Sequence, residues 1–492
     1  MLPPEIASLL ELYLDSVHDM QQFSFLGLVD NSPLSAYKAL KSQNNGFQQI
    51  QSLRKLWNYD APYPDEAAVA REKTLVTQQI NLHKKIPLSL YQQKSYRVIA
   101  ASLSRIVFNK LPERVKPSAQ PMLDASLGSL IGVQQEIAYR RYQTGSYATP
   151  YESLIREYNP HLTEEKTNDY CSIITDLMDD VMDRPAHKIV TSDTDFREQL
   201  SFGQKMQMLQ DMQEWFGIPA GYLEIYPASA PAVIGSSHAA FMSHDFKHPD
   251  LAIFLGDSVH EIGHVNYKLH LPKNLRRTAS GQILGTGHDE AQAYILENHI
   301  LEDDATREFI CDYLVKGYGL SPAKWNPQNL DRYDRTFNFQ TRRLESCDLS
   351  NLVHIAVLTG IERDLINSGA SGKTYGARWK QAMQHYNPAA AQSFDYSLNL
   401  YPFAGLFGNY PSYFEGAAGA AQLYEAGLAQ NPQWTGQWRQ GNFRETAGWL
   451  AEHAQKPAST KPIDQLYQDA TGSPLTTEAF LTKYRAKYGL NT

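Results

Sequence analysis

The chain has 492 residues, of which 42% are hydrophobic and 20% are charged, so it can build a large core and global disorder is excluded. Its 45 basic and 53 acidic side chains leave a net charge of −8, which argues against a general nucleic-acid or anionic-membrane binder. Three cysteines are too few for a disulfide framework and fit a reducing compartment. The N-terminus lacks the basic start of a secretory signal, and no apolar run approaches the ~18 residues that cross a bilayer. We therefore expect a cytoplasmic protein of enzyme size.

Helical patterns dominate the N-terminal part of the chain. Apolar residues recur at helical spacing within 9–17, 99–107 and 173–182, and stretches rich in Asn, Gly and Pro separate these segments. The character changes within 218–245, which is rich in Ala, Ser, Gly and β-branched residues and predicts two or three short strands. Helical periodicity returns after Pro249 and continues to the end.

These patterns predict a mainly α fold, with one small β element next to the segment that follows Pro249. We divide the chain into an N-terminal helical region, 1–195, and a catalytic helical region, 196–492. No linker rich in Gly, Ser or Pro separates the two, so we expect one continuous structural unit.

The strongest chemical signal is the motif His260-Glu261-Ile262-Gly263-His264, within a segment that reads as a helix entered through Pro249 and Asp250. A spacing of four residues places the two histidines on one face of a helix, one turn apart. Two imidazoles in this arrangement can bind one tetrahedral cation such as zinc. Glu261 is placed to reach a water molecule at the metal, which is the position of a general base.

A third ligand is needed, and two candidates follow the motif. His270 stands at the metzincin offset, but that class needs Gly where this chain has Tyr267, so we consider this alternative the weaker one. Glu290 lies in a second predicted helix that begins near Gly287, and a His/His/Glu set with one position left to water is typical of catalytic zinc sites.

Three neighbouring polar residues have two interpretations each. His288 and Asp289, which flank Glu290, belong either to the capping turn of that helix or to a set of hydrogen-bond partners that orient the metal ligands. Asp257, one turn before His260, is either a surface acid or such an orienting partner.

On these residues the sequence resembles the carboxypeptidase Taq family of zinc metallocarboxypeptidases. The segment 289–298, DEAQAYILEN, is similar to the family segment that supplies the third zinc ligand through its Glu. Further similar segments are 342–347, which resembles an Ile-Arg-x-x-Ala-Asp motif, and 407–413, which resembles Phe-Gly-Tyr-Phe-Pro-Thr-Tyr. The likeness is clear from about 145 to 430.

The chain also departs from the family pattern. The family's His-Pro-Phe and Asp-x-Arg-x-Thr motifs are missing, and Tyr401 stands where the family has a histidine. Because these motifs line the family's substrate groove, the resemblance implies that the zinc chemistry is kept while substrate recognition is altered.

The resemblance implies a single helical body with a deep active-site groove, a short β-sheet near the zinc helix, and one Zn²⁺ or a similar ion such as Co²⁺ per chain. It further implies peptide substrates, a homodimer, and no nucleic-acid or membrane partner. His260, His264 and Glu290 are the expected metal ligands, and Glu261 is the expected general base.

The remaining site residues are assigned to the substrate. Tyr401 is the first candidate for stabilising the oxyanion, and Tyr410 and Tyr413 are its alternatives. Arg343 is the candidate for binding the C-terminal carboxylate, because its planar fork matches a carboxylate. His238 is a weak substitute for the missing second arginine.

Two other functions fit part of the sequence. A helical zinc oligopeptidase would share the His/His/Glu site but cleave short peptides internally. A catalytically weak, peptidase-like binding protein would explain the missing groove motifs, although it would not explain why Glu261 is kept. Product analysis, metal content and peptide turnover distinguish these functions.

Overall fold

A computed structural model describes residues 67–82, 86–184, 194–228, 231–275, 279–336, 348–393 and 396–490. The helices are α3 (Ala67–Leu82), α4 (Leu88–Lys110), α5 (Lys116–Tyr142), α6 (Pro150–Tyr158), α7 (Glu164–Met182), α8 (Phe202–Phe216), α9 (Leu251–His270), α10 (Thr286–Tyr294), α11 (Asp304–Tyr318), α12 (Pro327–Asp334), α13 (Asp348–Ser368), α14 (Tyr375–Tyr386), α15 (Pro388–Ser393), α16 (Leu400–Ala404), α17 (Pro411–Gln430), α18 (Trp434–Trp438), α19 (Arg444–Leu450), α20 (Ile463–Thr471) and α21 (Glu478–Lys487). The strands are β1 (Leu223–Pro227), β2 (Ala232–Ser236) and β3 (Ala239–His244). The predicted mainly α fold with a small β element is therefore confirmed.

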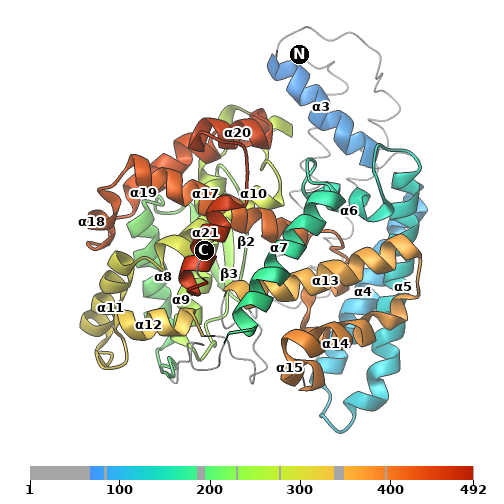
Figure 1. Ribbon diagram of the computed structural model, residues 1–492, viewed down its shortest axis with the longest axis horizontal. Coiled ribbons are helices and arrows are strands. Elements are labelled where there is room, and N and C mark those ends of the chain that lie inside the picture. The colour runs from blue at the N-terminus through green and yellow to red at the C-terminus, as the bar shows by residue number, and fades with distance from the viewer. Residues whose placement is uncertain are drawn as a thin grey trace.

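The helices lie in two groups on the two sides of the molecule in Figure 1. Figure 1 shows α4, α5, α13 and α14 on the right and α8, α9, α11 and α12 on the left, with α10 and α17 nearer the middle. One hydrophobic cluster runs through both groups and includes Leu127, Leu177, Ile262, Leu358 and Leu423. The division of the chain at residue 195 stays a prediction.

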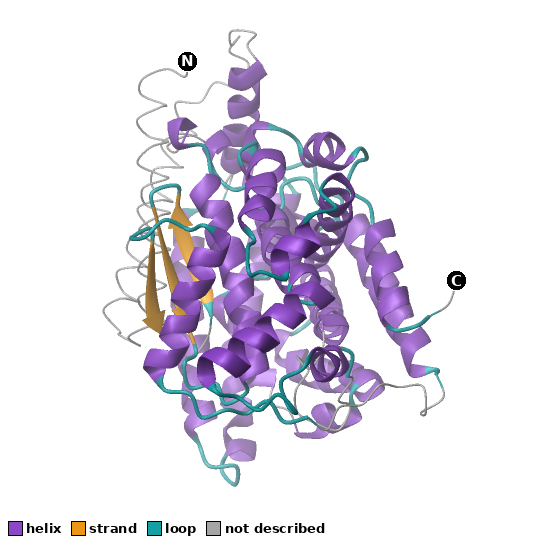
Figure 2. Ribbon diagram, turned by 90° about the vertical axis from the view of Figure 1, so that its left-hand side faces the viewer, coloured by secondary structure: helices purple, strands orange, loops and turns teal. Residues whose placement is uncertain are grey.

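The three strands form one small sheet in the order β1-β3-β2. β1 pairs with β3 in parallel, with Leu223 opposite Ala240, and β2 pairs with β3 antiparallel, with Ala232 opposite Ser243. Figure 2 shows this sheet on one side of the helical body, and both β2 and β3 pack against α9. The strands predicted within 218–245 are thus present, and they lie beside the helix that carries the histidine motif.

Local sequence signals explain where the helices near the site begin and end. Asp250 caps α9, because its side chain accepts hydrogen bonds from the backbone N–H groups of Ala252 and Ile253. The preceding helix, α8, begins with a capping box between Ser201 and Gln204 and ends at Gly217, whose φ of 73° is a left-handed conformation that glycine adopts without strain.

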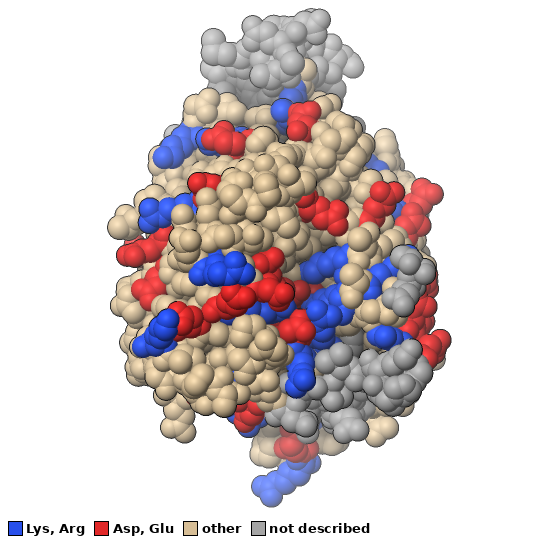
Figure 3. Space-filling model, turned by 60° about the vertical axis from the view of Figure 1, so that its left-hand side comes forward, with Lys and Arg blue, Asp and Glu red and all other residues tan. Residues whose placement is uncertain are grey.

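The surface agrees with the modest net charge. On the face that Figure 3 turns forward, acidic and basic side chains lie interspersed rather than in separate areas of one sign. Within the described ranges, every helix is too short or too polar to cross a lipid bilayer. The helix predicted within 9–17 lies outside the described residues.

Candidate metal centre and active site

Two neighbouring helices bring the three predicted ligands together. His260 and His264 lie one turn apart on α9, and their Nε2 atoms are 3.2 Å apart. The Oε2 atom of Glu290, on α10, lies 3.6 Å from the first of these nitrogens and 3.8 Å from the second. Ligands bound tetrahedrally at zinc distances lie about 3.3–3.4 Å from one another. The geometry therefore suits one shared cation.

Glycines allow α10 to come this close to its neighbours. A Cβ atom on Gly263 of α9 would lie 2.4 Å from the carbonyl oxygen of Gln292, and one on Gly416 of α17 would lie 2.6 Å from the Cβ of Glu290. Real Cβ atoms essentially never approach so closely. The missing side chains let α10 sit tightly between α9 and α17, and this packing sets the position of Glu290.

Each histidine donates its second ring nitrogen to a carboxylate. His260 Nδ1–H donates to Glu297 Oε2 at 2.8 Å, and His264 Nδ1–H donates to Asp289 Oδ1 at 3.1 Å. Both bonds leave Nε2 free to bind a metal, which is how carboxylate–histidine pairs orient metal ligands. Lys268 donates to the other oxygen of Asp289, so a buried cation balances this carboxylate.

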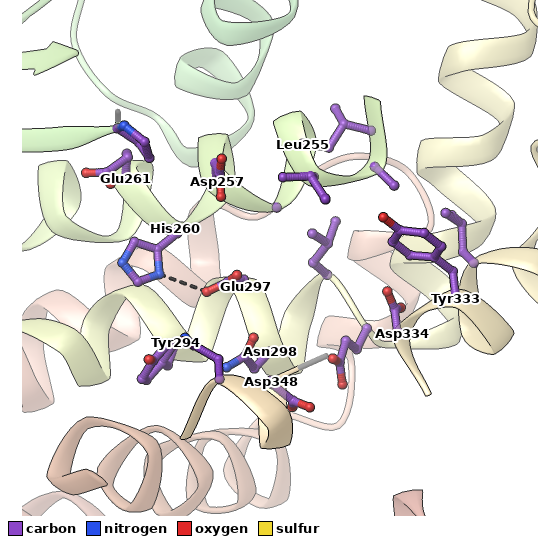
Figure 4. A pocket seen from close by; sticks show the side chains of 18 of the residues that line it. Leu255, Asp257, His260, Glu261, Tyr294, Glu297, Asn298, Tyr333, Asp334 and Asp348 are labelled. Atoms are coloured by element: carbon purple, nitrogen blue, oxygen red, sulfur yellow. Dashed lines mark hydrogen bonds and ion pairs between the residues drawn. The ribbon is translucent and has the colours of Figure 1, made fainter. Parts of the chain in front are cut away.

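A π-helical segment explains how Glu297 reaches His260. After Tyr294, α10 continues as a π-helix over Ile295–Ile300, which changes the angle at which the following side chains leave the axis. This turn carries Glu297 toward His260, as Figure 4 shows by the dashed line between them.

Electrostatics at the cluster favour a cation. Burial by itself lowers the pKa of His260, but the carboxylates of Glu297 and Glu290 outweigh it and raise the pKa to about 10. Burial raises the pKa of Glu290, whose Oε2 has no hydrogen-bond partner among the described residues. An unpartnered carboxylate oxygen beside two imidazoles is costly unless a cation satisfies it, so the residues present fit a zinc ion.

Glu261 meets the requirements of a general base. It is 5% exposed, and its Oε2 has no hydrogen-bond partner among the described residues. Burial raises the pKa of its carboxyl group above the ordinary value. Glu261 also lines a cavity of about 420 Å³ that begins at the metal cluster (Figure 4).

Two of the three predicted tyrosines lie at the metal cluster. The hydroxyls of Tyr401 and Tyr413 share a hydrogen bond, and burial, together with the charge of Glu290, raises the pKa of both. Tyr410 stacks on Tyr401 with ring centroids 5.2 Å apart. Burial raises the pKa of its hydroxyl, and the carboxylate that adds to this shift is that of Glu362, not that of Glu290.

Two of the other predicted residues, His238 and His270, lie away from the cluster. His238 is exposed in the turn between β2 and β3. Arg343 lies outside the described residues. His270, the weaker candidate ligand, is the last residue of α9, and its Nδ1 bonds the backbone oxygen of Asn266 instead of joining the other two histidines.

The structure distinguishes between the two interpretations given for Asp289, His288 and Asp257. Asp289 orients His264, whereas His288 bonds the backbone oxygen of Ala454 and lies near Tyr467. Asp257 lines the cavity, and the partner of His260 is Glu297.

Two orienting residues were missed from the sequence although helical periodicity marks both. Lys268 stands four residues after His264, so it lies on the same face of α9. Glu297 stands seven residues after Glu290, which again is the same face of a helix. These offsets place both residues on the same helix faces as the metal ligands, but they do not show which group each of them pairs with.

The Lys268–Asp289 pair gives a test of metal binding that does not depend on activity. We expect Lys268→Met to weaken zinc affinity by about 10–100-fold, because the buried Asp289 loses its counter-charge and no longer holds His264 in place. Competition with a chelator measures the affinity. Lys316→Met is the matched control, because this lysine is 75% exposed and, among the described residues, forms its ion pair with Asp312 on its own helix. Unchanged zinc affinity in Lys268→Met would contradict the orienting role.

The chain is similar to known carboxypeptidases in sequence. It is 26% identical over 250 residues to carboxypeptidase 1 of Bacillus subtilis (strain 168), covering 50% of this chain and 49% of that protein. It is 22% identical over 241 residues to thermostable carboxypeptidase 1 of Thermus thermophilus, covering 47% of this chain and 46% of that protein. The matched stretches thus span about half the length of these curated relatives.

Solved structures share the fold over almost the whole chain. Trypanosoma cruzi metallocarboxypeptidase 1 matches with a TM-score of 0.85 at 17% identity, covering 98% of both chains. Pyrococcus furiosus carboxypeptidase matches with a TM-score of 0.82 at 16% identity, covering 99% of both. The sequence profile of the carboxypeptidase Taq (M32) metallopeptidases matches residues 35–488, and the chain therefore belongs to this family.

Proposed function

We propose that this protein is a zinc-dependent metallocarboxypeptidase that removes C-terminal residues from short or unfolded peptides. The observation that carries the proposal is the convergence of His260, His264 and Glu290 on one point, next to a cavity that the buried Glu261 lines. Family membership supports the same class of reaction.

Glu261 is proposed to move the protons of the reaction. When bound, a zinc ion polarises the scissile carbonyl and makes water more acidic. Glu261 takes the proton of the attacking water and later delivers it to the leaving amine. Its raised pKa supports this role, because a base works best when its pKa approaches the working pH.

Tyr401 is proposed to stabilise the oxyanion, together with Tyr413. The two hydroxyls share one hydrogen bond, so the pair keeps a proton available for the substrate. Burial raises the pKa of both groups, which keeps them protonated and able to donate. Donors fixed in a buried site stabilise a developing negative charge better than water does.

The remaining assignments stay predictions. Arg343 is proposed to bind the terminal carboxylate, with His238 and Tyr410 as further substrate contacts. Zinc as the native metal is proposed on the ligand set and the family resemblance, a homodimer on the resemblance alone, and a cytoplasmic location on the few cysteines and the N-terminal sequence.

A comparison of two substrates tests the exopeptidase activity. An N-blocked dipeptide and its C-terminal amide differ only in the charge of the terminal group, so we expect the amide to react about 10–100-fold more slowly. Equal rates would contradict C-terminal recognition, and internal fragments from longer peptides would indicate an oligopeptidase instead. Bound zinc without any turnover would indicate a peptidase-like binding protein.

A further inference from the structure

The cavity beside the metal cluster combines apolar walls with a charged end. Its volume is about 420 Å³, near the lower limit of ligand pockets, which span roughly 300–1,000 Å³. It begins at His260, Glu261 and Tyr413 and extends to Tyr333 and Asp334 (Figure 4). Apolar side chains also line the cavity, among them those of Leu255, Leu301, Ile310, Leu330 and Leu352.

Negative charge is in excess along this cavity. Among the described lining residues, the acids are Asp257, Glu261, Glu297, Glu302, Asp334 and Asp348, and the basic residues are His260 and Arg307. Counting also Lys483 and Lys487, which pair with two of these acids from α21, six acids face four basic residues. The cavity therefore attracts a cation more readily than an anion.

Two of the acids are already satisfied by the protein. Glu302 pairs through one oxygen with Lys487 at 2.6 Å and through the other with Lys483 at 3.3 Å. Asp348 accepts hydrogen bonds from Lys487 and from the hydroxyls of Tyr484 and Tyr488. These carboxylates hold α21 against the cavity wall and have little capacity left for a ligand.

Asp334 keeps an oxygen for a ligand. It is the last residue of α12, and its Oδ2 accepts a hydrogen bond from Arg307 Nη2 at 2.9 Å. Its Oδ1 has no donor among the described residues, and its side chain is 29% exposed. The same guanidinium also donates to Asp331 at 3.1 Å and lies 3.6 Å from Asp304, so Arg307 divides its charge among three carboxylates.

We propose that this cavity receives the side chain of a C-terminal arginine or lysine, and that Asp334 binds its cationic tip. Both side chains carry a charged tip on an apolar stem, which matches apolar walls that lead to a carboxylate. The inference rests on the proposed carboxypeptidase function and adds the class of substrate to it.

Three N-blocked dipeptides test the proposal with the zinc-loaded protein. They end in arginine, in citrulline, which is a neutral isostere of arginine, and in leucine. We expect kcat/KM to be about 10–100-fold higher for arginine than for citrulline, because only arginine forms the charged pair. Since this comparison uses the unaltered protein, it decides the proposal even where a variant fails to fold.

Two isosteric variants show which carboxylate causes the preference for arginine over citrulline. Asp334→Asn is expected to reduce the arginine-to-citrulline ratio to nearly one. Asp331→Asn is the matched control, because it removes another carboxylate that pairs with Arg307, and Asp331 does not line this cavity. The ratio for this variant should equal that of the unaltered protein. An equal fall of the arginine-to-citrulline ratio in both variants would overturn the assignment to Asp334.

The outcomes separate this inference from the function on which it rests. Release of C-terminal residues without preference for arginine would overturn the inference and leave the carboxypeptidase function standing. No release from any of the three peptides would refute the proposed function, and the inference with it.

Discussion

Replacing Glu261 by Gln is expected to lower the rate of peptide hydrolysis by about 10²–10⁴-fold while zinc stays bound. The amide has almost the shape of the carboxylate but cannot accept the proton of the attacking water. His260, His264 and Glu290 keep their positions, because none of them bonds Glu261. The measurements are kcat with an N-blocked dipeptide and the zinc content of the same sample.

A loss of rate is informative only if the metal remains. Equal zinc content in Glu261→Gln and in the unaltered protein would assign the loss to proton transfer, whereas retained turnover would remove Glu261 from its role as base. Glu165→Gln is the matched control, since Glu165 is an exposed acid in the first turn of α7, and it should leave both quantities unchanged.

The second large effect concerns stability, and it comes from a buried carboxyl group on α13. Glu362 is fully buried, and its Oε2 accepts hydrogen bonds from Tyr151 at 3.2 Å and from the backbone of Gly408 at 3.0 Å. Its Oε1 has no partner among the described residues. Burial raises the pKa of Glu362 from 4.5 to about 8, which the two hydrogen bonds only partly offset.

The sign of the pH dependence follows from this shift. The folded protein holds the proton of Glu362 more tightly than the unfolded chain does, so this group favours folding most below a pH of about 4.5. The contribution is lost as the pH rises from about 4.5 to about 8, because the unfolded chain releases the proton first. Glu362→Gln stays neutral at every pH.

We therefore expect Glu362→Gln to be more stable than the unaltered protein above pH 8, by about 3–5 kcal/mol. The advantage should shrink toward pH 5. Denaturant unfolding of both proteins at several pH values measures it, and Glu445→Gln, an exposed acid, serves as control. A difference in unfolding free energy that does not change with pH would contradict the raised pKa of Glu362.

Residues that act within one helix could be predicted from the sequence. The spacing of His260 and His264 is a property of the α-helix, and Asp250 caps that helix as its residue type predicts. The short strands within 218–245 followed from composition. Glu290 needed more than periodicity, because it lies on another helix. Its residue type, which completes a His/His/Glu set, and the family resemblance both indicated it.

The tertiary structure alone decided how closely α10 packs against α9 and α17. Gly263 and Gly416 act only through the distance they allow between neighbouring backbones, and no local pattern shows which glycine faces another helix. The π-helical turn that directs Glu297 to His260 also has no sequence signal that we could use.

The chain by itself thus determined which side chains can bind a metal and which one can act as a base, because these properties depend on residue type and on spacing within a helix. Only the folded structure decided which carboxylate orients each histidine, that Lys268 balances one of them, and that Asp334 ends the adjoining cavity. Those relations join residues from different elements, and their distances are set by packing rather than by order along the chain.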